Sequence, residues 1–396
     1  MFALIMGLAL TLSGGVKTAP QEKPIAPLNA LTPKQIESGW IQLFDGTTTF
    51  GWKARGNADW KLTDDSVQGT APETGMGMLC TTSAFADYEL HAEAWIEENA
   101  NSGIFLRAPL EGDVTADNAY EVNIYDWHKK WPTGSINNVQ RTKRKVKSVL
   151  RWTSFDITAE GDHLVVLADG KKTVDAHDSK HSGGVIALQS WGKGFVRFRN
   201  VRIRPLSLKS IFNGKDLTGW KPLPGKSVFS VTPDGSLNIK NGGGDIQTEE
   251  QWGDFILQLD IYSNGDHLNS GVFFRSLPGV FWGGYESQVR NQWEGNDRTK
   301  PVDYGTGGLY NRHPSRKVVS SDREWFYMTV LANGAHIAIW INGFQTTDFV
   351  DTAPVGRSGS ARDGSRTKPG VISLQGHDPT TDLSFKNIRV VELPKP

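Results

Sequence analysis

The sequence predicts an all-β protein made of two tandem antiparallel β-sandwiches. Three observations predict it: a long internal repeat, apolar residues that alternate with polar ones, and a scarcity of helical patterns. Phe44-Asp45-Gly46 returns 168 positions later as Phe212-Asn213-Gly214, and Asn101–Arg107 returns at the same offset as Asn269–Arg275. This offset is far longer than the roughly 20–50 residues of a solenoid repeat. The chain therefore contains two copies of one domain.

The repeat divides the chain of 396 residues into three parts. Residues 1–30 are expected to form a signal peptide and a flexible lead-in, residues 31–206 the first sandwich, and residues 207–396 the second. The apolar run at positions 2–12 is too short to span a bilayer, and small residues follow it. It is typical of a signal-peptide core, although the basic segment that usually precedes such a core is missing. The sequence therefore predicts an exported protein, periplasmic or extracellular, without a transmembrane segment.

Local patterns predict one helix and many strands. Residues 32–39 carry a capping Thr32, a proline at the first helical position and a closing Gly39. Apolar residues occupy the odd positions of 255–261 and of 336–341, so one face of each strand is expected to be buried. Asn342-Gly343 and Asp169-Gly170 then predict hairpin turns at equivalent places in the two copies.

Composition excludes several classes of partner and cofactor. Lys plus Arg and Asp plus Glu both total 43, so the formal net charge is zero and nucleic acid is not expected as a partner. The basic run 141–147 fits a solvated loop or a charged edge strand better than a polyanion site. A single cysteine excludes an intrachain disulfide and a zinc cluster. No metal site and no required cofactor are predicted. The loops at Asp266-His267 and Asn296-Asp297 could hold calcium or could be solvated turns.

Five motifs occur in order in the second copy and resemble a known family. They are Phe212–Trp220, Asn269–Arg275, Tyr285–Gln288, Thr306–Tyr310 and Leu374–His377. Together they resemble the 3-keto-disaccharide hydrolase domain, and the first copy carries related motifs. The resemblance implies two concanavalin-A-like jelly-roll sandwiches, usually exported, that act on or bind carbohydrate. An oligosaccharide or glycoside is the expected partner.

Strand alternation locates a candidate site. If the apolar residues of each strand face inward, Arg275 with Glu286, and Arg107 with Glu121, are expected on the outer, concave face of a sheet. An Arg and a Glu repeated on facing strands is the best site candidate in the chain. The alternative interpretation is a structural salt bridge on the sheet face.

The two copies differ around this pair, which predicts a division of labour. The second keeps Gln288, Tyr310 and His377 of the family pattern, together with Asn269 and Gln375 from its motifs, so it is expected to carry any catalysis. The first has Asn123, Asn137 and Trp191 at the Gln, Tyr and His positions and is expected to bind glycan, to work on a different ligand, or to support the fold. Its aromatic loop could stack on sugar rings through Trp127 and Trp131, or these rings could be packed loop anchors.

The resemblance leads to a mechanistic hypothesis in which a 3-keto-glycoside is cleaved by elimination and hydration. Glu286 would remove the acidic C2 proton, Arg275 would stabilise the enolate, and Tyr310 or His377 would protonate the leaving oxygen. A non-catalytic, lectin-like pair of modules is the alternative. An ordinary retaining glycosidase is disfavoured because the second copy lacks a paired carboxylate on the strand of Glu286.

Overall fold

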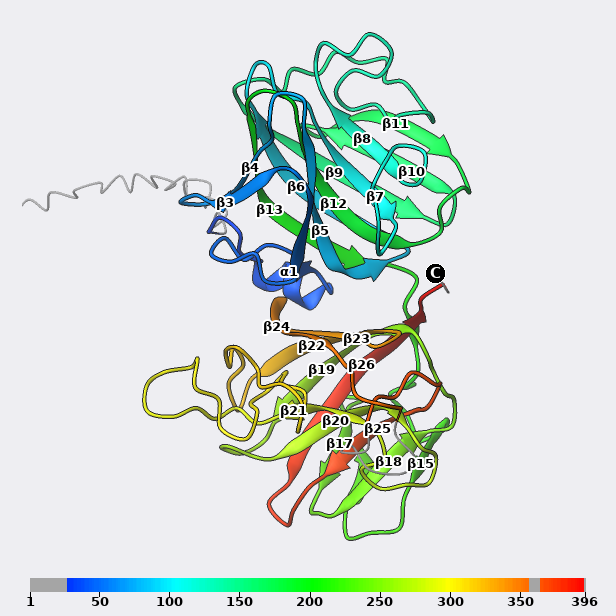
Figure 1. Cartoon of the computed structure of the whole chain (residues 1–396). Coiled ribbons are helices and arrows are strands. Elements are labelled where there is room, and N and C mark those ends of the chain that lie inside the picture. The colour runs from blue at the N-terminus through cyan, green and yellow to red at the C-terminus, as the bar shows by residue number, and fades with distance from the viewer. Residues whose placement is uncertain (1–26, 356–363, 395–396) are drawn as a thin grey trace, which may run out of the picture.

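The computed structural model describes residues 27–355 and 364–394, and it confirms the all-β prediction. The two halves of the chain form two sandwiches, one above the other in Figure 1. Each sandwich stacks an eight-stranded antiparallel sheet on a five-stranded one. Much of the predicted signal peptide within residues 1–30 lies outside the described residues. No helix in the described part of the chain is long and apolar enough to cross a membrane.

The predicted helix is present as α1 (Pro33–Glu37). Thr32 caps it, since its hydroxyl accepts the Gln35 N–H and the Gln35 side chain accepts the Thr32 N–H in return. Gly39 follows with a φ of +89°, a left-handed conformation that favours glycine and ends the helix.

The first sandwich is built from thirteen strands. Its eight-stranded sheet has the order β11-β10-β9-β6-β13-β4-β3, and β1 also pairs with β13. Its five-stranded sheet has the order β2-β5-β12-β7-β8. The bounds are β1 Ile41–Gln42, β2 Trp52–Gly56, β3 Asp59–Leu62, β4 Val67–Thr70, β5 Met76–Phe85, β6 Tyr88–Ile96, β7 Ser102–Ala108, β8 Tyr120–Ile124, β9 Trp152–Glu160, β10 His163–Ala168, β11 Lys171–His177, β12 Gly184–Trp191 and β13 Phe195–Pro205.

The second sandwich repeats this topology. Its eight-stranded sheet has the order β16-β17-β26-β19-β22-β23-β24 with β14 against β26, and its five-stranded sheet has the order β15-β18-β25-β20-β21. The bounds are β14 Lys209–Ser210, β15 Trp220–Pro222, β16 Val228–Val231, β17 Leu237–Lys240, β18 Gly244–Thr248, β19 Phe255–Ser263, β20 Ser270–Ser276, β21 Tyr285–Val289, β22 Trp325–Asn333, β23 His336–Ile341, β24 Phe344–Val350, β25 Val371–Gly376 and β26 Asp382–Glu392.

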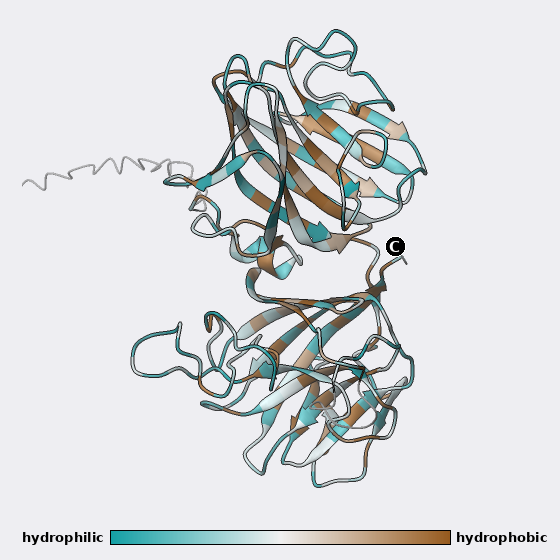
Figure 2. Ribbon diagram, in the orientation of Figure 1, coloured by the Kyte–Doolittle hydropathy of each residue, from teal (hydrophilic) through white to brown (hydrophobic). Residues whose placement is uncertain are grey.

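Alternation places the core between the sheets of each half, where Figure 2 shows brown segments along the strands. The odd positions of β19 from Phe255 to Ile261 are all buried in the second core, as predicted. Both predicted hairpins are present: Asn342 and Gly343 have φ of +50° and +77°, and the turn at Asp169-Gly170 also has positive φ at both residues. Because turn chemistry and alternation agree, the strand register is well specified.

The two halves contact each other through the outer face of the second eight-stranded sheet. Trp340, Ile256 and Leu331 belong to the same apolar cluster as the core of the first half. The Trp340 indole N–H donates to the Gln42 carbonyl at 2.9 Å, and Arg316 pairs with Asp45 at 2.8 Å. The inner layer of this contact is apolar, as in a stable interface. The five-stranded sheet of the second half takes no part in these contacts, and its outer face carries the candidate site.

Candidate functional site

Polar side chains form a row across the outer face of the second five-stranded sheet. Asp245 on β18 pairs with Gln375 on β25, and Gly271 on β20 pairs with Gln288 on β21. Val272 pairs with Leu374, so the antiparallel register brings Gly271 beside Gln375. The row therefore runs Asp245, Gln375, Gly271, Gln288. Asp245, Gln375 and Gln288 are all buried.

Glu286 occupies the gap that Gly271 leaves in this row. It stands on β21 two residues before Gln288, on the same face of the sheet. A Cβ added to Gly271 would come 2.3 Å from Glu286 Oε1 and 2.7 Å from its Cγ. The carboxyl group therefore lies directly over the glycine, in a place that no other residue type would leave open.

Glu286 is a buried carboxyl group that has no cationic partner within residues 27–355 and 364–394. Its side chain is 6% exposed and makes no hydrogen bond or ion pair with any described residue. Burial raises its pKa well above the usual value, and the carboxylates of Asp303 and Asp245 raise it further. Burial also raises the pKa of Asp245 to about 7, opposed by the hydrogen bond from the Trp282 N–H. The site therefore contains two carboxyl groups whose protons are held far more tightly than in water.

The loop between β20 and β21 covers one end of the row. The Trp282 backbone N–H donates to Asp245 at 3.2 Å, and Gln247 bonds Gly279 and Val280 of the same loop. The Phe281 and Trp282 rings stack at 4.6 Å, and Trp282 stacks on His377 at 6.1 Å. Both aromatic side chains are more than a third exposed. This end of the site is therefore an aromatic wall that is open to solvent.

The loop after β21 forms the other end. Asp303 accepts hydrogen bonds from Gln288 at 3.0 Å and from Asn269 at 3.2 Å. The Tyr310 N–H donates to the Glu286 carbonyl, which places Tyr310 beside the carboxyl-bearing strand. Tyr310 also packs against Tyr304 at 5.1 Å. Glu286, Gln288, Asn269, Tyr310, Gln375 and His377 thus gather on one face of one sheet.

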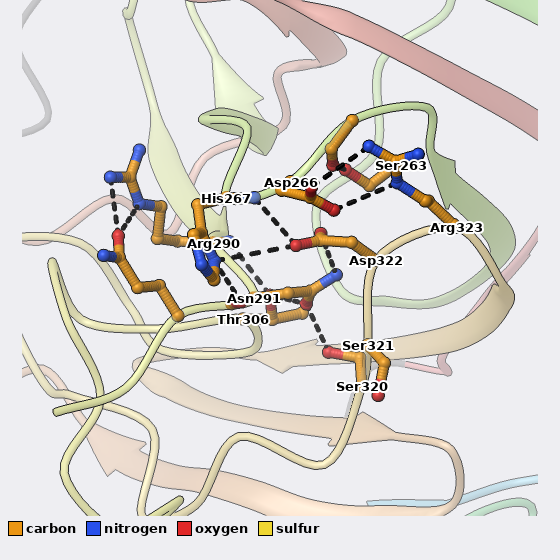
Figure 3. Close-up of polar contacts among 12 residues, drawn as sticks. Ser263, Asp266, His267, Arg290, Asn291, Thr306, Ser320, Ser321, Asp322 and Arg323 are labelled. Atoms are coloured by element: carbon orange, nitrogen blue, oxygen red, sulfur yellow. Dashed lines mark hydrogen bonds and ion pairs between the residues drawn. The ribbon is translucent and has the colours of Figure 1, made fainter. Parts of the chain in front are cut away.

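A buried polar network beneath this loop holds it in place (Figure 3). Asn291 accepts from the hydroxyls of Thr306 and Ser320 and donates to Asp322. Asp322 also accepts the His267 N–H at 2.7 Å. Asn291 is the residue that follows β21 by two positions, so the network fixes the loop that carries Asp303 and Tyr310 relative to Glu286.

The expected placement of the two arginines is wrong. The Arg275 guanidinium bonds the carbonyls of Gly253, Gly334 and Arg366 and pairs with Asp254 at 2.8 Å. It does not contact Glu286, and the same holds for Arg107 and Glu121. Arg107 repeats the pattern with three carbonyls and Asp87.

The reason is a β-bulge that simple alternation cannot anticipate. Arg275 and Arg107 have φ of +49° and +53°, and the pairing of β20 with β25 shifts register between Phe273 and Ser276. A left-handed residue breaks the two-residue alternation, so its side chain leaves the expected face. Both arginines therefore stabilise the fold, each by bonding three backbone carbonyls and an aspartate. The alternative of an Arg–Glu salt bridge on the sheet face is excluded as well.

The first half also has a glutamate over a glycine, but apolar side chains replace much of the polar row beside it. Glu121 lies over Gly103, where a Cβ would come 3.0 Å from its Oε1, and burial raises the pKa of Glu121 to about 7. The Asn137 amide donates to this carboxyl group and works against the rise. Register places Met78, Cys80 and Ala187 where the second half has Asp245, Gln247 and Ser373. These three belong to an apolar cluster on the outer face.

The aromatic loop of the first half is divided between exposed and anchored residues. Trp127 is 63% exposed. The Trp131 carbonyl accepts from Asn123, its N–H donates to His128, and its ring lies 4.9 Å from the Lys130 ammonium. Trp131 is therefore held by its own loop, whereas Trp127 is free to contact a ligand.

The two loops considered for calcium have other partners. The Asp266 carboxylate forms a bidentate pair with Arg323 at 3.0 Å, visible in Figure 3. Asp297 accepts from Thr299 and lies 3.8 Å from Lys300. Within residues 27–355 and 364–394, no group of three or more His, Cys, Asp or Glu side chains could hold a metal ion.

Both halves match one protein family. Residues 39–204 and 207–391 match the family described as the 3-keto-alpha-glucoside-1,2-lyase-like domain. The chain belongs to this family. The match covers both sandwiches and agrees with the resemblance seen in the motifs of the second half.

Individual relatives are more distant. A levanase of Bacillus subtilis (strain 168) is 25% identical over 199 residues, which are 48% of this chain and 26% of the levanase. The chain thus spans about a quarter of the length of that relative. A putative glycosyl hydrolase from Parabacteroides distasonis ATCC 8503 has a TM-score of 0.41 at 18% identity, covering 46% of this chain and 100% of that chain. The carbohydrate binding module CBM66 from Bacillus subtilis has a TM-score of 0.33 at 23% identity, covering 39% and 95%.

Sequence reasoning missed three members of the site. Asp245 could have been found, because an aspartate that alternates with apolar residues in a strand is unusual and shares the face of Gln247. Trp282 and Asp303 gave no such signal, because both lie in loops whose path the tertiary structure decides.

Proposed function

We propose that the second half of this exported protein cleaves 3-keto-glycosides by elimination and hydration, with Glu286 as the base. The single observation that carries the proposal is the carboxyl group of Glu286, buried over Gly271 with no Lys or Arg of the described residues paired with it. A base works best when its pKa lies near the operating pH, and an ordinary glutamate is too weak for this task. Burial and two neighbouring carboxylates supply the rise.

The reaction balances without a cofactor. Glu286 takes the proton from C2, and the electron pair moves to the C3 ketone to form an enolate. The enolate then collapses, the C1–O bond breaks, and the leaving oxygen takes a proton. A water molecule then adds its hydroxyl group to C1, its remaining proton restores the acid, and Glu286 returns its proton to C2, so the net result is hydrolysis. Since Arg275 faces away, the enolate would be stabilised by the Gln375 amide, which lies on the residue opposite Gly271, and by the hydroxyl group of Tyr310, whose backbone N–H bonds the Glu286 carbonyl.

Asp245 is the best candidate for the acid that protonates the leaving oxygen. Its pKa of about 7 keeps a large protonated fraction at neutral pH. It lies two strands from Gly271, a separation of about 10 Å at the usual strand spacing, with Gln375 between them. One pyranose ring fits this span. His377 stands at the exposed end, held by Asp378 at 2.9 Å, and is suited to bind the group on the far side of the scissile bond.

Glycan binding without cleavage is the second candidate function. The exposed wall of Phe281 and Trp282 favours it, because aromatic rings offer an apolar face to a sugar ring. The first half fits this role better than catalysis, since Asn137 engages Glu121 and the row beside it is apolar.

A pair of matched variants tests the proposal. Glu286→Gln should reduce turnover of a 3-keto-disaccharide at least about 10³-fold while the protein keeps its fold, because the amide cannot take the C2 proton. Glu121→Gln makes the same change in the first half and should leave most turnover intact. Release of the free sugar is measured by chromatography, and folding by circular dichroism. Full activity of Glu286→Gln would end the assignment, and binding without turnover in the wild type would favour the lectin-like role.

A further inference from the structure

A row of side chains on the outer face of the second eight-stranded sheet has no role in the proposed reaction. Asn238 on β17 pairs with Ser384 on β26, and Ser384 pairs with Tyr262 on β19. Tyr262 in turn pairs with Trp325 on β22. Paired residues of an antiparallel sheet share a face, so the four form one row that spans three strand spacings, about 14 Å. Ile261, the neighbour of Tyr262, lies in the apolar core, which places the row on the outer side of the sheet.

A hollow of about 410 Å³ lies over this row. The first half covers another part of the same face, where the Gln258 amide donates to the Gly39 carbonyl at 2.9 Å. Tyr262 stands four residues beyond Gln258 on β19, a distance of about 13 Å, so the row continues past that contact. Lys240 and Asn264, which line the hollow, are exposed. The hollow is therefore open to solvent, and its volume falls in the range of small-molecule sites, about 300–1,000 Å³.

The first half shows why the hollow exists. At the equivalent place Arg197 pairs with Gln68 on one side and with Trp95 on the other, as Ser384 does with its two neighbours. The Arg197 guanidinium bonds the Gln68 side chain at 2.9 Å and lies 5.0 Å from the Phe195 ring and 5.8 Å from the Trp95 ring. An arginine therefore fills the row in the first half. In the second half a serine takes its place, and the short side chain leaves the row open.

The hollow offers hydrogen-bonding groups beside aromatic rings. Asp382 accepts hydrogen bonds from the side-chain amides of Asn238 and Asn264, each at 3.0 Å. Because a carboxylate accepts and an amide nitrogen donates, the carbonyl oxygen of the exposed Asn264 points away from Asp382 and can accept from a ligand. The Tyr262 and Trp325 rings lie 5.4 Å apart, and neither the phenol nor the indole N–H bonds another residue of the described ranges. Both groups can therefore bond a ligand.

We propose that this hollow is a second glycan site, which binds an uncharged oligosaccharide. A sugar ring presents apolar C–H groups on its faces and hydroxyl groups, which both donate and accept, around its edge. The hollow matches the first through its pair of aromatic rings and the second through its amide, phenol and indole groups. The proposal goes beyond the cleavage reaction and does not depend on it, because the sandwich core separates the hollow from Glu286. A glycan held here would keep further sugars at a high local concentration around the protein.

Binding of the full chain to immobilised oligosaccharides tests the proposal. The panel consists of uncharged gluco-, manno-, galacto-, xylo- and fructo-oligosaccharides. We expect at least one class to bind, and Ser384→Arg to weaken that binding at least about tenfold, because the arginine fills the row as Arg197 does in the first half. Trp325→Ala should weaken it about tenfold through the lost aromatic contact. Trp152→Ala, the matched change in the first half, and Trp282→Ala, on the face of Glu286, should leave it unchanged.

Each outcome decides. Absence of binding to every class overturns the proposal, and so does binding that a folded Ser384→Arg retains in full. Circular dichroism shows whether each variant is folded, and if Ser384→Arg is not, the comparison of Trp325→Ala with Trp152→Ala decides, since equal losses would overturn the assignment to the hollow. Binding lost in Trp282→Ala instead of Trp325→Ala would place the glycan on the face of Glu286 and overturn the second site. Failure to cleave 3-keto-disaccharides would refute only the proposed reaction, because binding in the hollow requires no ketone.

Discussion

Replacing Gly271 by alanine tests whether the position of the Glu286 carboxyl group over Gly271 matters for the reaction. A Cβ at this position would lie 2.3 Å from Glu286 Oε1, and ordinary van der Waals contact begins at 3.4 Å. The carboxyl oxygen must therefore move by about 1 Å, the difference between these two distances. A displacement of this size at a catalytic group costs about 10²-fold in rate. The added methyl group should also cost about 1–3 kcal/mol of folding stability through overpacking.

The first half supplies the matched control. In Gly103→Ala the new Cβ would lie 3.0 Å from both Cγ and Oε1 of Glu121, so a shift of a few tenths of an ångström relieves the contact. We expect Gly271→Ala to lower kcat/KM on a 3-keto-disaccharide about 10²-fold and Gly103→Ala to leave it unchanged. Initial rates at several substrate concentrations measure both, and urea unfolding shows that each variant is folded.

One result would refute this reasoning. If folded Gly271→Ala retains kcat/KM within about threefold of the wild type, the position of Glu286 over the glycine is not needed for the reaction. Glu286 would then lose its role as the base, whatever its pKa. Equal losses in Gly271→Ala and Gly103→Ala would instead show that both halves contribute.

Further predictions concern stability. Arg275→Ala and Arg107→Ala should each lower the free energy of unfolding by about 3–5 kcal/mol, because each leaves buried carbonyls and an aspartate without their partner. Urea unfolding measures this loss. Loss of turnover in Arg275→Ala without loss of stability would contradict the structural role. Asp245 has a pKa of about 7 in the folded state against an ordinary value of 3.8, so the folded state holds the Asp245 proton more tightly than the unfolded state does. The contribution of this protonated group to stability is therefore greatest below pH 3.8 and is lost as the pH rises to about 7. Asp245→Asn should therefore be more stable than the wild type at pH 8, by up to about 4 kcal/mol, and equal to it near pH 3.5; a wild type that is no less stable at pH 8 than Asp245→Asn would argue against a proton held at this position. Trp340→Ala should cost about 3–5 kcal/mol and separate the unfolding of the two halves into two calorimetric transitions, whereas one unchanged transition would mean that other contacts couple them.

Part of the site could be predicted from the sequence because strand alternation is a local property. Glu286 and Gln288 share a face with each other and oppose Tyr285 and Ser287, whatever the rest of the chain does. The repeat added a second, independent example of the same pattern in Glu121 and Asn123. These positions, the helix cap at Thr32 and the turns at Asn-Gly and Asp-Gly follow from a few neighbouring residues.

The arginines and the loops needed the tertiary structure. Whether Arg275 follows the alternation depends on one bulge, and that bulge is stabilised by carbonyls 22, 59 and 91 positions away in the chain. Asp303 and Trp282 reach the site only because hydrogen bonds to Gln288 and Asp245 fold their loops back over the sheet. No short-range pattern encodes such contacts.

The sequence by itself therefore determined that this chain folds into two related β-sandwiches and that a glutamate stands on the outer face of each. Only the tertiary structure decided that the second glutamate is buried near the carboxyl groups of Asp245 and Asp303 while Arg275 pairs with Asp254 instead, and that the first accepts a hydrogen bond from Asn137. The physical reason is that alternation and turn chemistry act over a few residues, whereas desolvation and charge pairing are set by groups that folding brings together from distant parts of the chain.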